Sequence, residues 1–206
     1  MVGKFHHLPF VVFTNLRQKF DSCLNYYCWI KIIFIFNAER DGPKLDEKLI
    51  YRIGIGLIKG IGPVLARNLI AYLGDESAIF KESAASLAKV PGIGSVLASA
   101  IVNSHVLTRA EEELNFIDKH KIDVLYFTDK RYPVRLQMCE DAPLVLYSKG
   151  NVDYNALHTL SIVGTRRPSV NGKEICERLV QDLAALFPGL VVVSGMAYGI
   201  DICYVS

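Results

Sequence analysis

Apolar and polar residues follow two different patterns along the chain, one before and one after about residue 118. From Asp46 onward, apolar residues recur every three or four positions, which predicts amphipathic helices. Beyond residue 118, short apolar runs predict strands at 122–127, 143–150, 159–164 and 190–195. A further amphipathic pattern over 171–187 predicts a helix between the last two strands. We therefore expect an all-helical part followed by an α/β part.

The helical part contains an internal repeat of 32 residues. The segments GIGPVLARNLI and GIGSVLASAIV begin at Gly60 and Gly92 and share the same apolar and glycine positions. Each copy predicts a helix, a tight hairpin and a second helix, in which both glycines supply positive φ values and close backbone approach. Ile61 and Ile93 are expected to point inward, and Pro63 suits the first turn of the following helix.

The repeated hairpins have two interpretations. The pattern resembles the helix-hairpin-helix motif, whose hairpin amides and following helix N-terminus can hold a DNA phosphate without reading the base sequence. The alternative is a scaffold that buries its own apolar faces or contacts another protein. The secondary candidates for phosphate binding in these hairpins are Gly60, Gly62, Gly92 and Gly94.

The α/β part contains a predicted β-α-β unit between residues 159 and 195. Loops 164–169 and 194–201 would then leave the carboxyl ends of adjacent parallel strands, where open α/β sheets bind ligands. The predicted fold class is α/β, with an N-terminal all-α helix-hairpin-helix (SAM-like) domain followed by the start of an extended Rossmann-like parallel α/β domain. The domain boundaries that we expect are 1–44, 45–118 and 119–206.

The two loops carry residues suited to an anion, most plausibly a phosphate. Gly164 lets the backbone approach a ligand, while Arg166 offers a planar fork of donors. The candidate residues are Gly164, Thr165, Arg166, Ser169, Ser194, Gly195 and Gly199, with Arg167 and Lys173 as secondary candidates. Asp201 is interpreted as a helix cap rather than as a chemical group. A dinucleotide is disfavoured, because the loops lack G-x-G-x-x-G and the acidic residue that a ribose requires.

Composition narrows the class of protein. About half of the 206 residues are hydrophobic, so a globular protein is expected. The five cysteines show no C-x-x-C pair or Cys/His cluster, which favours a reducing cytosol over disulfides or a zinc site. We expect no metal and no organic cofactor. The first 44 residues hold six basic and three acidic side chains, so the rest carries a net charge of −1 and any DNA site there is a local patch.

The first 44 residues are poorly specified by their sequence. The apolar run at 26–36 includes Lys31 and has 11 residues, too few to span a bilayer, which needs about 20. The following FNAERDGPK offers no signal-peptide cleavage site. We interpret residues 1–44 as an extension, possible alternatives being a non-native segment, an edge strand or a partner-binding arm.

The order of motifs resembles one bacterial family, DNA-processing protein A (DprA/Smf). The pieces are RYPVRL for the family's YPxxL, DAPLVLYSKGN for PPxxLxxxGN, SIVGTRRPSVNG for IVGxRxxSxYG, and VVVSGMAYGID for SGxAxGID. With the helix-hairpin-helix region, the resemblance covers roughly residues 45–203.

The resemblance implies a cytoplasmic, non-enzymatic protein that binds single-stranded DNA and loads the RecA recombinase during natural transformation. It implies an extended Rossmann-like domain and a homodimer. The residues that it places in the DNA phosphate pocket are Gly164, Thr165, Arg166, Ser169, Ser194, Gly195, Gly199 and Asp201.

The chain departs from the family pattern in two places. Asn171 replaces a tyrosine, which removes one possible stacking surface. Tyr204 and Val205 replace Ala-His after SGxAxGID, and the sequence stops at Ser206. We therefore expect a truncated or frameshifted product or a partial gene model, which lacks later strands and the dimer surface and leaves strand edges and apolar faces uncovered.

Two other functions remain open. A Gly-x-Arg loop in a Rossmann-like pocket also occurs in nucleotide phosphoribohydrolases of the lonely-guy kind, but their PGGxGTxxE signature is not present here. The third possibility is a helix-hairpin-helix adaptor whose α/β part does not fold and which has no DNA function.

Overall fold

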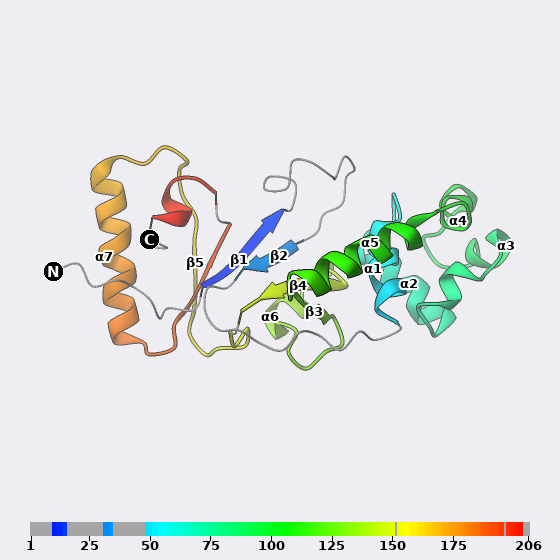
Figure 1. Ribbon diagram of the computed structural model, residues 1–206, viewed down its shortest axis with the longest axis horizontal. Coiled ribbons are helices and arrows are strands. Elements are labelled where there is room, and N and C mark those ends of the chain that lie inside the picture. The colour runs from blue at the N-terminus through cyan, green and yellow to red at the C-terminus, as the bar shows by residue number, and fades with distance from the viewer. Residues whose placement is uncertain (1–9, 16–30, 35–47, 151, 196, 204–206) are drawn as a thin grey trace.

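A six-stranded mixed sheet forms the middle of the molecule in the computed structural model, which describes residues 10–15, 31–34, 48–150, 152–195 and 197–203. The strand order across the sheet is β3-β4-β2-β1-β6-β5. The strands are β1 (Phe10–Asn15), β2 (Lys31–Phe34), β3 (Asp123–Tyr126), β4 (Val145–Lys149), β5 (Thr159–Ile162) and β6 (Val191–Ser194). Helices lie at both ends of this sheet rather than only over its faces (Figure 1).

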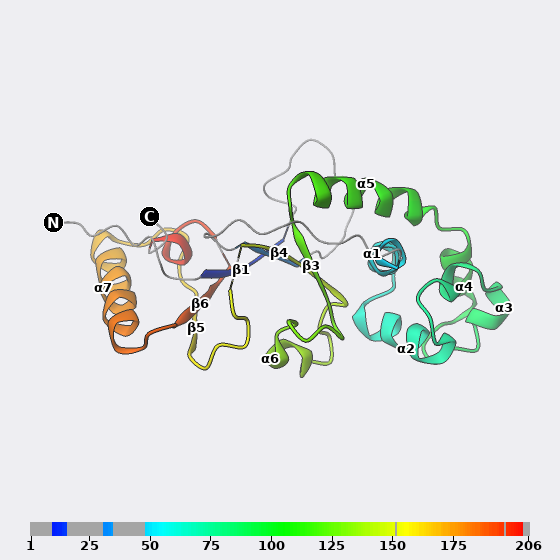
Figure 2. The ribbon, with the colours of Figure 1, turned by 60° about the horizontal axis from the view of Figure 1, so that its bottom comes forward.

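One end of the sheet carries the helical unit, which we define as α1 to α5 (Figures 1 and 2). Its elements are α1 (Leu49–Leu57), α2 (Pro63–Leu73), the 3-10 turn η2 (Ala78–Phe80), α3 (Ala84–Leu87), α4 (Ser95–Val102) and α5 (Val106–Lys119). The short helix α6 (Val134–Gln137) follows β3. Among the described residues, no helix is long and apolar enough to cross a membrane.

The repeat seen in the sequence has the same backbone in both copies. Gly60 and Gly92 adopt φ values of +86° and +85°, which favour glycine. Gly62 and Gly94 precede α2 and α4 with φ values of −86° and −83°, which any residue can adopt. The prediction that both glycines of each hairpin need positive φ is therefore wrong for the second glycine. Ile61, like its counterpart in the second copy, is buried as expected.

The two hairpins pack on each other reciprocally. A Cβ atom built at Gly60 would lie 3.0 Å from Leu97 Cδ2, and one built at Gly92 would lie 2.7 Å from Leu65 Cδ2. Leu65 and Leu97 occupy the same position in the two copies of the repeat. Each hairpin glycine therefore makes room for the leucine of the other copy, which gives the pair an approximate two-fold relation.

The helical unit and the sheet share hydrophobic clusters. Tyr126 of β3 and Leu144, just before β4, pack with the core of the two hairpins. Tyr147 of β4 packs with Leu49 of α1 and Ile117 of α5. The predicted boundary at residue 118 therefore runs through a continuous apolar contact, and this contact holds the helical unit at the β3–β4 side of the sheet.

The β-α-β unit predicted from the sequence is confirmed. Strands β5 and β6 are parallel neighbours, and α7 (Val170–Leu186) connects them. Cys176 and Val180 of α7 are buried against Leu190 and Val192. The carboxyl ends of β5 and β6 consequently lie side by side at one edge of the sheet.

The rest of the sheet differs from the prediction of a parallel sheet. Strand β4 is antiparallel to β3 and parallel to β2, β2 is antiparallel to β1, and β1 is parallel to β6. Strand β4 therefore runs opposite to β6, and the sheet is mixed.

Two segments of the first 44 residues form strands in the middle of the sheet. Strand β1 pairs with β6, where Val12 lies opposite Ser194, and β2 pairs with β4, where Ile32 lies opposite Tyr147. The alternative of an edge strand is therefore wrong for both segments, because each has a neighbour on either side. The other residues of this extension lie outside the described residues.

Candidate functional site

The loops that follow β5 and β6 lie directly against each other. The backbone N–H of Ile200 donates to the carbonyl oxygen of Thr165 over 3.2 Å. Gly199 has a φ of +109°, and a Cβ atom there would lie 2.1 Å from the same Thr165 oxygen. Only glycine fits at this position, so the loops predicted to form one site are brought together by a close backbone contact.

Asp201 connects the two loops through two hydrogen bonds. Its carboxylate oxygen Oδ1 accepts a hydrogen bond from the backbone N–H of Gly164 over 3.0 Å, and its carbonyl oxygen accepts one from Ser194 Oγ over 3.0 Å. Asp201 is only 6% exposed and lies within the 3-10 turn η3 (Ile200–Ile202), whose N-cap is Gly199. The interpretation of Asp201 as a helix cap is therefore wrong, because its carboxylate holds the first loop in place.

The outer face of the site carries cationic side chains. Arg166 and Arg167 are exposed, and neither forms an ion pair within the described parts of the chain. Thr165 Oγ1 accepts a hydrogen bond from the backbone N–H of Arg167 over 3.2 Å, which shapes the loop. Lys173 lies in the first turns of α7 and is also exposed. Three cations are thus available to an anion at this edge.

Two of the predicted hydroxyls are already engaged within the protein. Ser169 is the N-cap of α7, where its Oγ accepts a hydrogen bond from the backbone N–H of Gly172 over 3.1 Å. Ser194 is buried and donates to Asp201. Both residues set the shape of the loops, and their direct contact with a ligand stays a prediction.

Sequence reasoning missed one exposed aromatic side chain at the site. Tyr198 is 84% exposed and precedes Gly199, whose Cβ position would lie 2.7 Å from Arg166 Cα. Tyr198 is therefore next in the chain to the residue that contacts the backbone of the arginine loop. An aromatic residue within a glycine-rich loop was the available signal, because such a loop offers few positions where a large ring could be buried.

The α/β part of the chain matches a known protein family. The model of the family described as DNA recombination-mediator protein A matches residues 123–206. This part of the chain is similar to that family. The family expected from the motifs is confirmed, and both loops of the site lie inside the matched region.

Three curated relatives carry the DprA or Smf name. A DNA processing protein DprA of Bacillus subtilis is 36% identical over 81 residues, which cover 39% of this chain and 27% of the relative. The Protein Smf of Synechocystis is 28% identical over 158 residues, covering 73% of this chain and 38% of the relative. A DNA processing protein DprA of Streptococcus pneumoniae is 40% identical over 73 residues, 35% of this chain and 25% of the relative. The chain thus spans well under half the length of these DprA/Smf relatives.

The hairpin candidates lie far from the DprA/Smf loops. Figure 1 shows the helical unit and α7 at opposite ends of the sheet. Gly60, Gly62, Gly92 and Gly94 are all exposed, so their backbone is accessible. The structure therefore does not bring the two sets of sequence candidates together, and the hairpins form a separate surface.

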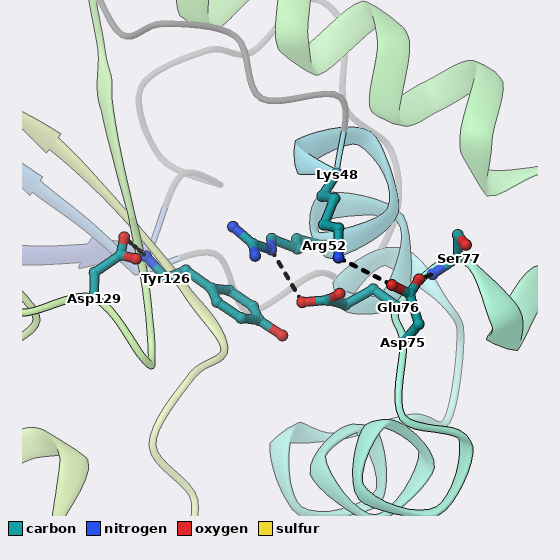
Figure 3. Close-up of polar contacts among 7 residues, drawn as sticks. All are labelled: Lys48, Arg52, Asp75, Glu76, Ser77, Tyr126 and Asp129. Carbon is teal, nitrogen blue, oxygen red and sulfur yellow. Dashed lines mark hydrogen bonds and ion pairs between the residues drawn. The ribbon is translucent and has the colours of Figure 1, made fainter.

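A polar cluster lies where the helical unit meets the DprA/Smf region (Figure 3). Arg52 Nε donates to Glu76 Oε1 over 3.1 Å, and the Arg52 guanidinium lies 4.1 Å from the ring centroid of Tyr126. Lys48 Nζ lies 3.0 Å from Asp75 Oδ2. The backbone N–H of Tyr126 donates to Asp129 Oδ2 over 2.7 Å. The contact between Arg52 and Tyr126 joins α1 to the end of β3, and the two ion pairs join α1 to the segment that follows α2.

The pKa values of Asp75, Glu76 and Tyr126 in this cluster are shifted from their ordinary values. Hydrogen bonding from Lys48 lowers the pKa of Asp75 to about 2. Burial acts to raise the pKa of Glu76, but its own backbone amide, Tyr126 and Arg52 outweigh burial, so the pKa is lowered. Burial, and then the charge of Glu76, raise the pKa of Tyr126. Asp75 and Glu76 are thus ionised at neutral pH, which their ion pairs with Lys48 and Arg52 require.

Cys203 follows the loop after β6. Burial raises the pKa of the Cys203 thiol, and its Sγ donates to the carbonyl oxygen of Ile200 over 3.1 Å. A protonated thiol is a poor nucleophile. Within the described residues, no group of three or more His, Cys, Asp or Glu side chains could hold a metal ion.

Proposed function

We propose that this chain binds single-stranded DNA and takes part in DNA processing during natural transformation. The observation that carries the proposal is the site formed by the loops after β5 and β6. Arg166, Arg167 and Lys173 are exposed there, and a hydrogen bond from Gly164 N–H to Asp201 holds the first loop in place. The relatives named DNA processing protein DprA support the same role.

The chemistry of the loops suits a nucleic-acid backbone. The guanidinium of Arg166 can donate two parallel hydrogen bonds to a phosphate, and Arg167 and Lys173 add charge nearby. Gly164 and Gly195 serve the packing of the two loops, because a Cβ atom built there would lie 2.6 Å from Ile200 Cβ and 3.0 Å from Asp201 Oδ2, respectively. Tyr198 can stack on a base, which is sequence-tolerant because every base has a flat face. Binding is then salt-dependent and largely independent of sequence.

The proposed partners are single-stranded DNA and the RecA recombinase, and the proposed location is the cytoplasm. Transfer of DNA to RecA needs only reversible phosphate contacts, so the protein acts as a mediator rather than as an enzyme. Within the loops, the buried carboxylate of Asp201 accepts a hydrogen bond from Gly164 N–H. This use of the acid favours a structural role over proton transfer.

The helix-hairpin-helix adaptor remains a second candidate function. The open backbone at Gly62 and Gly94 favours it, because no atom lies within 4 Å of a Cβ built at either glycine. Under this function, substitutions at these two glycines weaken ligand binding and Arg166→Ala does not.

The test is fluorescence anisotropy of a labelled single-stranded oligonucleotide, titrated with the full chain across a salt series. We expect Arg166→Ala to weaken binding about tenfold or more, as loss of a charge-assisted hydrogen bond predicts. The matched control is Arg178→Ala, which removes an exposed arginine from α7 outside the loops. Equal affinities for the two variants would refute the loop site.

A further inference from the structure

A cavity of about 400 Å³ lies between the helical unit and the sheet. Its walls come from the end of α1, the first hairpin, the start of α2 and the segment Pro143–Tyr147 that enters and forms β4. Most of the lining residues are apolar, including Ile53, Leu57 and Leu144. A volume of this size accommodates a small organic group.

Two glycines keep this cavity open. Gly56 and Gly62 both line it, and no atom lies within 4 Å of a Cβ built at either position. Gly62 also has an ordinary φ of −86°, and Gly56 lies within α1, where glycine destabilises a helix. Backbone conformation and packing therefore do not require glycine here. What the two glycines provide is free volume at the wall.

The charge on the lining is positive. Arg52 and Lys59 line the cavity, and no acidic residue is among its described lining residues. Arg52 is held by Glu76 and by the Tyr126 ring, so its guanidinium has a set position. Lys59 is exposed and immediately precedes Gly60 of the hairpin. The cavity thus combines apolar walls with a cation that can meet an anion from solvent.

The apolar walls of the cavity suit a flat apolar group, and the cation at its edge suits an anion attached to that group. A nucleotide of single-stranded DNA combines both. We propose that the cavity takes one nucleobase of bound single-stranded DNA while Lys59 contacts the adjoining phosphate. The inference rests on the proposed function and adds a second contact at the end of the sheet opposite to the loops after β5 and β6. The apolar walls hold the base by contact rather than by hydrogen-bond readout, so any base is accepted.

The test uses two variants of the full chain and two matched controls. Gly56→Leu places a side chain in the cavity, and Ala71→Leu adds the same side chain at an exposed position of α2 that does not line it. Lys59→Gln removes the cation, and Lys89→Gln removes an exposed lysine near the second hairpin. Circular dichroism melting verifies that each variant folds, and Gly56→Leu is expected to melt no lower than the wild type.

Two readouts locate the base and the phosphate. In anisotropy titrations, we expect Gly56→Leu to weaken binding about tenfold, as the loss of one stacked base predicts. Lys59→Gln is expected to reduce the slope of log K against log salt by about one. Oligonucleotides that contain 5-iododeoxyuridine are expected to photocross-link to peptides that contain residues 52–66 or 143–147.

The outcomes separate this inference from the proposed function. If the wild type binds single-stranded DNA, but Gly56→Leu binds as tightly as Ala71→Leu and cross-links map only to residues 163–203, the cavity inference is overturned and the loop site stands. If the wild type does not bind single-stranded DNA at all, both are overturned. Unchanged DNA binding together with loss of a RecA interaction in Gly56→Leu would assign the cavity to a protein and also overturn the inference.

Discussion

The helical unit and the β-α-β unit bury their apolar residues in different ways. In the helical unit, each hairpin covers the other through the reciprocal contacts of Gly60 with Leu97 and Gly92 with Leu65. In the β-α-β unit, α7 packs through one face only, and its other face exposes Ile175, Leu179 and Leu186. The two copies of a duplicated element can bury each other's apolar residues. A single crossover helix covers one side of a sheet, and the apolar residues on its own outer face stay exposed.

The exposed apolar residues of the two regions differ in arrangement too. Val64 and Val96 of the helical unit are exposed at the same position after each hairpin. Along α7, exposed apolar residues occur from its first residue, Val170, to Phe187 just beyond its end. The helical unit, which also exposes Tyr72 and Val102, has separate exposed apolar residues, whereas those of the β-α-β unit follow the length of one helix, an arrangement of the kind that associates with other chains.

The largest effect is expected from breaking the reciprocal contact. Gly92→Val combines a φ of +85°, unfavourable for a branched side chain, with a Cβ position 2.7 Å from Leu65 Cδ2. We expect a loss of about 3 kcal/mol in the free energy of unfolding, the sum of backbone strain and overpacking. Urea unfolding measures it.

Gly94→Ala is the control for this change, because its φ is −83° and its Cβ position is open. It is expected to change the free energy of unfolding by less than about 0.5 kcal/mol. Similar losses for the two variants would show that the hairpins do not depend on the reciprocal packing.

The next effect concerns the β-α-β unit. Asp201→Ala leaves the backbone N–H of Gly164 without its acceptor, so we expect a loss of about 2 kcal/mol and weaker DNA binding. Hydrogen exchange of the Gly164 amide, which should accelerate in the variant, reports the loss directly. An unchanged exchange rate would mean that the loop after β5 holds its shape without the carboxylate.

Acid should loosen the junction between the two regions. Because the pKa of Glu76 is lowered on folding, Glu76 contributes stability above its unfolded pKa of about 4.3, and this is lost as pH falls through the folded pKa. Asp75, whose pKa is lowered to about 2, acts in the same direction. Glu113 opposes them, since burial raises its pKa and its protonation favours the folded state.

Glu76→Gln separates these contributions. We expect the variant to lose about 1 kcal/mol at pH 7 and to show a shallower fall of stability between about pH 5 and pH 3 than the wild type. Urea midpoints measured across that range test the prediction. A variant as steep as the wild type would place the acid sensitivity elsewhere.

The smallest effect on stability is expected on the outer face of α7. Leu179 is 51% exposed, so Leu179→Glu should change the free energy of unfolding by less than about 0.5 kcal/mol. The same change should reduce self-association, measured by sedimentation velocity. If self-association persists, the exposed face of α7 is not the surface by which copies of the chain meet.

Local pattern predicted much of the α/β part. The strand expected at 190–195 is β6 at Val191–Ser194, and the helix expected at 171–187 is α7 at Val170–Leu186. Both follow from a contiguous apolar or amphipathic run with turn residues at its ends. The contact between the two loops also followed from strand order, since adjacent parallel strands end at one edge.

Features that depend on distant partners were not predictable in the same way. Strand β1 pairs with β6, where Val12 lies opposite Ser194, and the sequence of β1 alone does not indicate which strand it pairs with. In the sequence of the repeat, Gly60 and Gly62 cannot be told apart, although only Gly60 has a positive φ. Asp201 accepts a hydrogen bond from a residue 37 positions earlier, which no local motif could indicate.

The hydrogen bond between Gly164 and Asp201 also orders events during protein synthesis. The loop after β5 leaves the ribosome before Asp201, the residue that holds it 37 positions later, and the intervening residues include all of α7. This edge of the sheet therefore cannot acquire its final shape while β5 alone is available. It forms only when the crossover is complete, so a nascent chain cannot present a finished site before its core around α7 has closed.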